Sequence, residues 1–216
     1  MAHITPTSLN AFLAAALNTL GKMMALRFYL AYKLLNSLFL GVSLGTIFTI
    51  YTPLNPKIYS LGGIALALGA FILSLFYTKL LNLKPYKKIL LGLEILPFFY
   101  LFAYLLFPNT FFGALIVYAL YQAGFIFGDY LGRTETLLFP RKFILSQLDK
   151  RKQIGYLLGL GIAFIFYTIL EFFGISQKES QIYAIHFLLL LLQCAVFFTL
   201  SCAFRQTRTK QWNPKT

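Results

Sequence analysis

The sequence predicts an all-α, polytopic membrane protein with six transmembrane helices and both termini in the cytoplasm. The composition indicates a membrane protein, because 59% of the residues are hydrophobic and only 12% are charged. In soluble domains roughly a quarter of the residues are charged. The apolar residues gather in long blocks, each near the roughly 20 residues with which a helix crosses a hydrocarbon core. Lipid offers no hydrogen-bond partner to a bare amide, so the blocks must be helical. The expected spans lie near residues 34–52, 58–78, 88–107, 110–131, 154–174 and 181–203.

The distribution of basic residues indicates the orientation. Of the 19 Lys and Arg residues, only Lys57 and Lys178 fall on one side of a six-span chain. The other 17 fall in the N-terminal region, in the connections after the second and fourth spans, and in the C-terminal tail. Because Lys and Arg stay cytoplasmic in short loops, we expect a multi-pass protein of the inner (cytoplasmic) membrane.

The net charge of +13 does not indicate a nucleic-acid partner. The basic residues are dispersed along the expected membrane edges, whereas nucleic-acid binding gathers them on one module or stripe. Contact with anionic lipid headgroups explains such a distribution. The first expected partner is therefore the lipid bilayer.

The N-terminal segment is predicted to lie on the membrane surface or against the bundle. Leu9, Phe12, Leu13 and Ala16 fall at helical spacing, with Asn10 on another face, which is the pattern of an amphipathic helix. The expected organisation is an amphipathic segment over residues 1–33, a six-helix bundle over 34–204 and a basic cytoplasmic tail over 205–216.

The stretch Tyr121–Arg133 combines a glycine face with a charge pair. Gly124, Gly128 and Gly132 recur every four residues, a spacing that lets a neighbouring helix approach closely. Asp129 and Arg133 are also four residues apart, so they are predicted to pair along the helix and to gate its movement. The alternative is a well-packed helix end with an interfacial salt bridge.

A second packing face is predicted on the first span, where Gly41 and Gly45 stand at GxxxG spacing. Thr46 follows them directly and is a candidate substrate contact. Small residues at this spacing are common in transporters and channels, and also in bundles without transport activity.

Polar residues at membrane depth are the remaining candidates for function. Glu94 lies about two turns into the third span, and an ionisable group there is costly to bury, so we expect a coupling or gating role. Tyr121, Gln122 and Gln193 fall near the middle of their spans and are candidate substrate contacts. For the two amides, hydrogen bonding between helices is the alternative.

No enzymatic activity, metal or cofactor is expected. The chain has no HExxH pattern, no clustered carboxylates and no P-loop. Its two cysteines, Cys194 and Cys202, are eight residues apart in the last apolar block. About 12 Å of helical rise separates them, so they cannot pair with each other.

Two segments resemble the N-terminal six-helix half of a major facilitator superfamily transporter. The segment TKLLNLKPYKKILL, from Thr78, stands where that family has its motif between helices two and three. The segment LSQLDKRKQIGYLLGL, from Leu145, is similar to the family's loop between helices four and five, which enters a glycine-bearing fifth helix. The family's Gly, Asp and Gly-Arg pattern is missing from the first segment, and the chain lacks a second six-helix half.

The resemblance implies a half-size transporter of an unidentified small solute. Such a chain would work as a homo-oligomer or with a partner membrane protein that supplies the other half of the path. Two alternatives remain open. One is a non-catalytic scaffold or assembly subunit of a larger membrane complex, and the other is a substrate-capture protein that works with an energising module.

Overall fold

The computed structural model describes residues 24–139 and 141–205, so most of the predicted N-terminal segment and basic tail lies outside the described residues. The described chain is all-α and has six helical regions long and apolar enough to cross a membrane, which confirms the predicted fold class. The third and fourth regions are each divided into two helices. The short helix α4 (Tyr77–Leu80) follows the second region. The regions are α2 (Leu26–Ile50), α3 (Pro56–Leu75), α5 (Leu83–Leu93) with α6 (Leu96–Leu106), α7 (Phe111–Ile126) with α8 (Gly128–Leu138), α9 (Lys142–Phe172) and α10 (Lys178–Phe204).

Local sequence signals set several helix ends. The Asn55 side chain accepts a hydrogen bond from the backbone N–H of Lys57, and Pro56 stands in the first turn of α3, where its missing N–H costs nothing. Thr110 caps α7 in the same way, accepting from the N–H of Gly113 at 3.0 Å. Short turns between long helices make neighbouring spans antiparallel.

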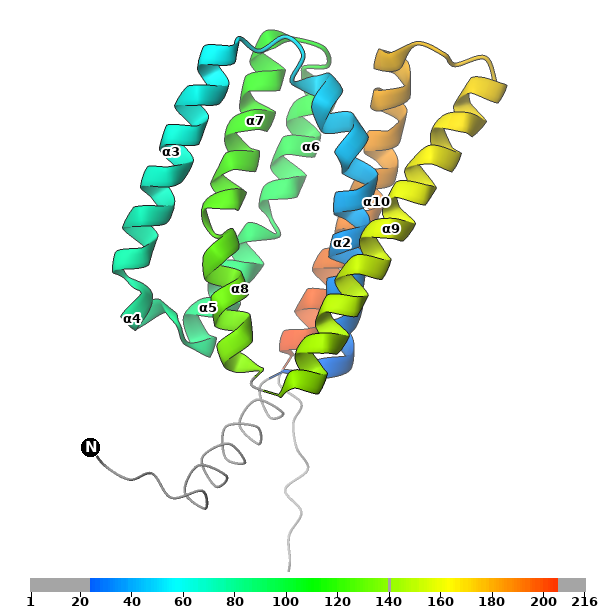
Figure 1. The fold of residues 1–216 in the computed structure, drawn as a ribbon. Coiled ribbons are helices and arrows are strands. Elements are labelled where there is room, and N and C mark those ends of the chain that lie inside the picture. Colours follow the sequence, from blue (N-terminus) through cyan, green and yellow to red (C-terminus); the bar gives the residue numbers. More distant parts are fainter. Residues whose placement is uncertain (1–23, 140, 206–216) are drawn as a thin grey trace, which may run out of the picture.

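The described chain begins and ends at the same end of the bundle (Figure 1). The backbone N–H of Ala25, just before α2, donates to the carbonyl oxygen of Ala203, near the end of α10, at 2.8 Å. An even number of spans requires this arrangement. We call this end the basic end, because α4, the start of α5, the end of α8 and the start of α9 also lie there with their Lys and Arg residues.

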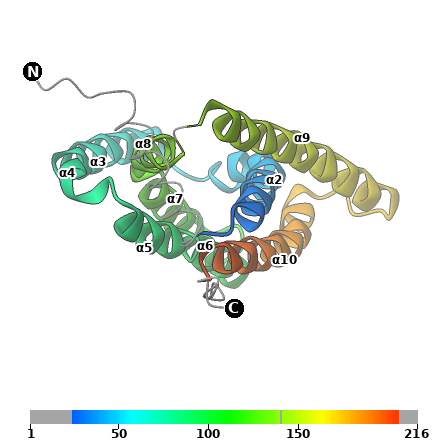
Figure 2. The ribbon, with the colours of Figure 1, turned by 90° about the horizontal axis from the view of Figure 1, so that it is seen from below.

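The first span is central to the bundle. Viewed from the basic end, α2 lies between α9 and α10 (Figure 2). The other spans follow from α10 through α6 to α7, and α3 packs on the far side of α7. None of the residues of α3 is buried, so this helix contributes little to the core.

Close approach between α2 and α9 depends on three glycines. A Cβ added at Gly155 would collide with the carbonyl oxygen of Leu34, and one added at Gly159 with that of Leu38. A Cβ at Gly41 would meet the backbone of α9 around Tyr156. Gly41 therefore lies at a close contact between α2 and α9.

The other predicted glycine contacts are not seen. A Cβ at Gly45 would make only an ordinary contact with Tyr167, at 3.9 Å. The predicted face of Gly124, Gly128 and Gly132 makes no close contact within the described chain, because a Cβ at any of them would have none of its atoms within 4 Å. The helix is interrupted at Phe127, and no neighbouring helix covers the three positions closely.

The predicted ion pair between Asp129 and Arg133 is also wrong. Both residues are exposed, and the ion pair that the described residues do form joins Lys33 to Glu135. Asp129 stands in the first turn of α8, where the positive end of the helix dipole stabilises its negative charge. This local interaction does not need Arg133.

Two boundaries differ from the prediction. The first span begins at Leu26, so residues 26–33 belong to the bundle and not to a surface segment. The connection after the fourth span is confined to residues 139–141, because α8 continues to Leu138 and α9 already begins at Lys142. The long basic loop that carried part of the family resemblance is therefore mostly helix. Lys and Arg side chains on such a helix extend along its surface, so that their charged groups reach the membrane edge.

Candidate functional site

Two interrupted spans border the same cavity. Pro97 has no N–H, and the N–H of Phe98 donates to Ile95 at 3.1 Å, so the carbonyl of Glu94 lacks its usual helical partner. The side-chain amide of Gln193, on α10, donates to that carbonyl at 2.8 Å. The interruption between α5 and α6 is thus stabilised by a neighbouring helix.

The second interruption lies between α7 and α8. The N–H of Phe127 donates to the carbonyl of Gly124, three residues back, at 3.3 Å, which is a tighter turn than an α-helix makes. Gly128 follows directly and weakens helix continuation at this point. Interrupted spans of this kind are typical of the substrate sites of membrane transporters.

The carboxyl group of Glu94 is buried at membrane depth and hydrogen-bonded at both oxygens. The Tyr32 hydroxyl donates to Oε1 at 2.6 Å, and the Gln193 amide donates to Oε2 at 3.1 Å. The Asn36 amide in turn donates to the Tyr32 hydroxyl at 3.2 Å. Only 6% of Glu94 is exposed, so these neutral donors replace the water that the carboxylate loses.

A second buried carboxyl group holds α8 against α2. Nζ of Lys33 donates to Oε2 of Glu135 at 2.9 Å, and the Tyr29 hydroxyl donates to Oε1 at 3.0 Å. The hydroxyls of Tyr29 and Tyr86 are also hydrogen-bonded to each other. The Lys33 ammonium lies 5.4 Å from the ring centroid of Tyr29 and 5.8 Å from that of Tyr32, within the range of cation–π attraction.

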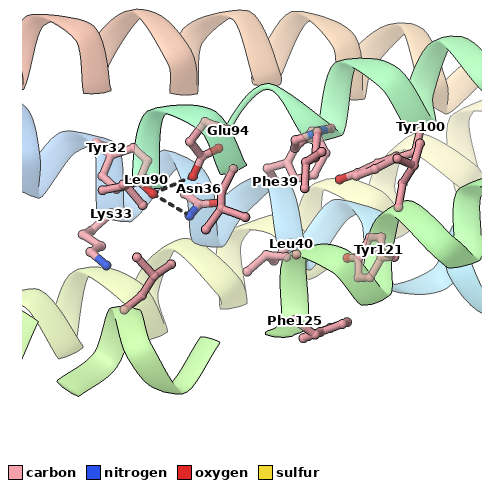
Figure 3. Close-up of a pocket in the computed structure, with 16 residues that line it drawn as sticks. Tyr32, Lys33, Asn36, Phe39, Leu40, Leu90, Glu94, Tyr100, Tyr121 and Phe125 are labelled. Carbon is pink, nitrogen blue, oxygen red and sulfur yellow. Dashed lines mark hydrogen bonds between the residues drawn. The ribbon is translucent and has the colours of Figure 1, made fainter. Parts of the chain in front are cut away.

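A cavity of about 210 Å³ lies between α2, the α5–α6 interruption and α7–α8. Its polar wall includes Tyr32, Lys33, Asn36 and Glu94. Figure 3 shows these groups at one end and Tyr100, Tyr121 and Phe125 at the other. The cavity is therefore amphipathic, with a charged end and an aromatic end. Its remaining lining is apolar and consists of Phe39, Leu40, Leu90, Leu93, Leu96, Pro97, Leu120, Gly124 and Leu131.

The predicted site residues divide into two groups. Glu94 and Tyr121 line the cavity. Gln193 does not line it but donates hydrogen bonds to Glu94. Thr46 is buried, but its hydroxyl donates to the Ser43 carbonyl of its own helix at 2.6 Å. The carbonyl oxygen of Gln122 is buried without a hydrogen-bond partner in the described chain, and Gln122 does not line the cavity.

Several residues of the site were not expected to belong to it. Lys33 falls in the predicted N-terminal segment, residues 1–33, and Glu135 falls in the predicted connection between the spans 110–131 and 154–174. The available signal was local, since Tyr32 and Lys33 follow Tyr29 by three and four residues and lie near it on the helix surface. Sequence alone did not indicate that Glu135 lies opposite these residues.

Two kinds of catalytic centre receive no support from the geometry. Residues 41–45 read GVSLG, which fits the serine-hydrolase pattern GxSxG. A nucleophile elbow needs a strand-to-helix turn, whereas Ser43 lies inside α2 and donates to the Leu40 carbonyl at 3.0 Å. In the part of the chain that the structure describes, no three His, Cys, Asp or Glu residues gather to hold a metal ion.

Comparison of the chain with protein-family models, curated proteins and solved structures finds no significant match.

Proposed function

We propose that this protein is a membrane transporter that carries a small solute through the cavity beside Glu94. The observation that supports this proposal most directly is the position of the cavity, between two interrupted spans and next to a buried carboxyl group. Interrupted helices provide free backbone groups and points of bending at membrane depth. A bundle with only a structural role needs neither free backbone groups nor points of bending in its spans.

The cost of burying Glu94 supports the same proposal. A charged side chain inside a membrane costs several kcal/mol and is retained where it lines a pathway or takes part in coupling. Glu94 stands where α5 ends and α6 begins, so a change in its interactions with Tyr32 and Gln193 would alter the bend between the two helices. We assign it the coupling role.

A second six-helix unit would complete the pathway. Two residues of the cavity lining, Leu40 and Phe125, are 41% and 57% exposed, so the described residues do not close the cavity. A second copy or a partner half, as in the facilitator arrangement, would cover it. The proposed location is the cytoplasmic membrane, with the basic end facing the cytoplasm.

Thiol labelling tests the transport proposal without a known substrate. In a chain carrying Cys194→Ser and Cys202→Ser, we expect Leu40→Cys to react with a membrane-impermeant thiol reagent from either side of sealed vesicles. Thiols react as thiolates, which requires water, and a transport cavity opens to each side in turn. The labelled fraction is measured by mass spectrometry in inside-out and right-side-out vesicles.

Leu68→Cys is the matched control, because Leu68 is 56% exposed on the lipid-facing α3. It should be labelled from neither side. If Leu40→Cys is also labelled from neither side, or only ever from one, the transport proposal fails. A structural subunit of a larger membrane complex would then be the better explanation.

The orientation has a separate test. Lys150 is exposed on α9 near the basic end, and Lys178 is exposed at the start of α10, at the opposite end. In the same cysteine-free chain, we expect Lys150→Cys to be labelled only from the cytoplasmic side and Lys178→Cys only from outside. The reverse result would invert the proposed topology.

A further inference from the structure

We infer that the cavity beside Glu94 binds small organic monocations, namely amines that carry an apolar or aromatic body. This inference rests on the proposed transport function and names the substrate class of the same cavity. Three properties of the cavity support it: its charge, its aromatic wall and its volume.

The ionisable side chains of the cavity wall are Lys33 and Glu94. The Lys33 ammonium is paired with Glu135 at 2.9 Å, and the two side chains are only 10% and 8% exposed. Glu94 accepts hydrogen bonds from the neutral groups of Tyr32 and Gln193. Glu94 therefore forms no ion pair among the described residues, and a bound ammonium group would supply one.

The opposite end of the cavity suits an apolar body. Tyr100, Tyr121 and Phe125 line that end (Figure 3), and the faces of aromatic rings attract cations as well as apolar groups. A ligand with an ammonium head and a ring or short aliphatic chain would match both ends. An anion would meet the uncompensated charge of Glu94, because Lys33 is already held by Glu135.

The volume restricts the size of the ligand. The cavity of about 210 Å³ equals about seven water molecules at about 30 Å³ each. Pockets for drug-sized ligands measure roughly 300–1,000 Å³. The cavity therefore suits an amine with a single ring.

Three probes of nearly the same shape separate charge from size. The purified full-length protein is placed in lipid nanodiscs and titrated calorimetrically with 2-phenylethylammonium, neutral 2-phenylethanol and anionic phenylacetate. We expect the cation to bind about 10-fold to 100-fold more tightly than the alcohol, as expected for a hydrogen bond to a charged group. Phenylacetate should bind most weakly.

Matched variants locate the site. Glu94→Gln should remove the preference for the cation over the alcohol, whereas Glu171→Gln, at an exposed position on α9, should leave this preference unchanged. If Glu94→Gln does not fold, Phe125→Ala provides an independent variant at an exposed wall position. It should weaken binding of the cation severalfold, while Phe164→Ala, 72% exposed on α9, should not.

The outcomes of this test are distinct from those of thiol labelling. Equal affinity for cation and alcohol, a preference for phenylacetate, or no binding of any probe would each overturn the inference. Labelling of Leu40→Cys from both sides together with one of these results would retain transport and reject the substrate class. Selective binding of the cation without such labelling would retain the site and reject transport.

Discussion

Replacing Glu135 with alanine is expected to lower the free energy of unfolding by about 3–5 kcal/mol, because a buried ammonium group is left without its counter-charge. Lys33 and Glu135 are 2.9 Å apart, and both side chains are at most 10% exposed. The pair joins the first helix of the bundle, α2, to the end of α8. Unfolding of the purified protein in mixed micelles, followed by circular dichroism during denaturant titration, measures the effect.

Two comparisons separate the pair from general effects of removing a carboxylate. Glu171→Ala, at an exposed position, should change stability by no more than about 0.5 kcal/mol. The double variant Lys33→Met with Glu135→Leu should recover most of the loss, since an apolar pair of similar volume often replaces a buried ion pair at little cost. Wild-type stability of Glu135→Ala would show that the pair does not stabilise the fold.

Replacing Gly159 with leucine is expected to separate α2 from α9 and to destabilise the protein by about 1–3 kcal/mol, the usual cost of overpacking. A Cβ at Gly159 would already collide with the Leu38 carbonyl and with the Cα of Gly41. These obstacles are backbone atoms, which cannot move aside as a flexible side chain can. The same micelle titration measures the loss.

Gly161→Leu is the matched control, because it makes the same substitution two residues further along α9. A Cβ there would have no atom of the described residues within 4 Å, and the position is exposed. The control should not destabilise the protein, because leucine is a better helix former than glycine by up to about 1 kcal/mol. Equal losses at the two positions would contradict the close contact between α2 and α9.

The sequence by itself determined the number and approximate limits of the spans. Hydropathy depends on each block alone, because every segment that crosses lipid must be apolar and helical whatever its neighbours are. Gly41 was recognised for a similar local reason, as part of a GxxxG spacing. Glu94 stood out because an acidic residue inside an apolar block is costly wherever it lies.

Only the tertiary structure decided which polar residues meet. Glu135 pairs with Lys33 although the two residues are 102 positions apart in the sequence, and no local pattern encodes such a contact. Gly124 and Gly128 matched the same spacing rule as Gly41, yet an interruption at Phe127 and the absence of a close neighbour left them without a packing role. Spacing shows which residues share a helix face, but the packing of the other helices decides what that face contacts.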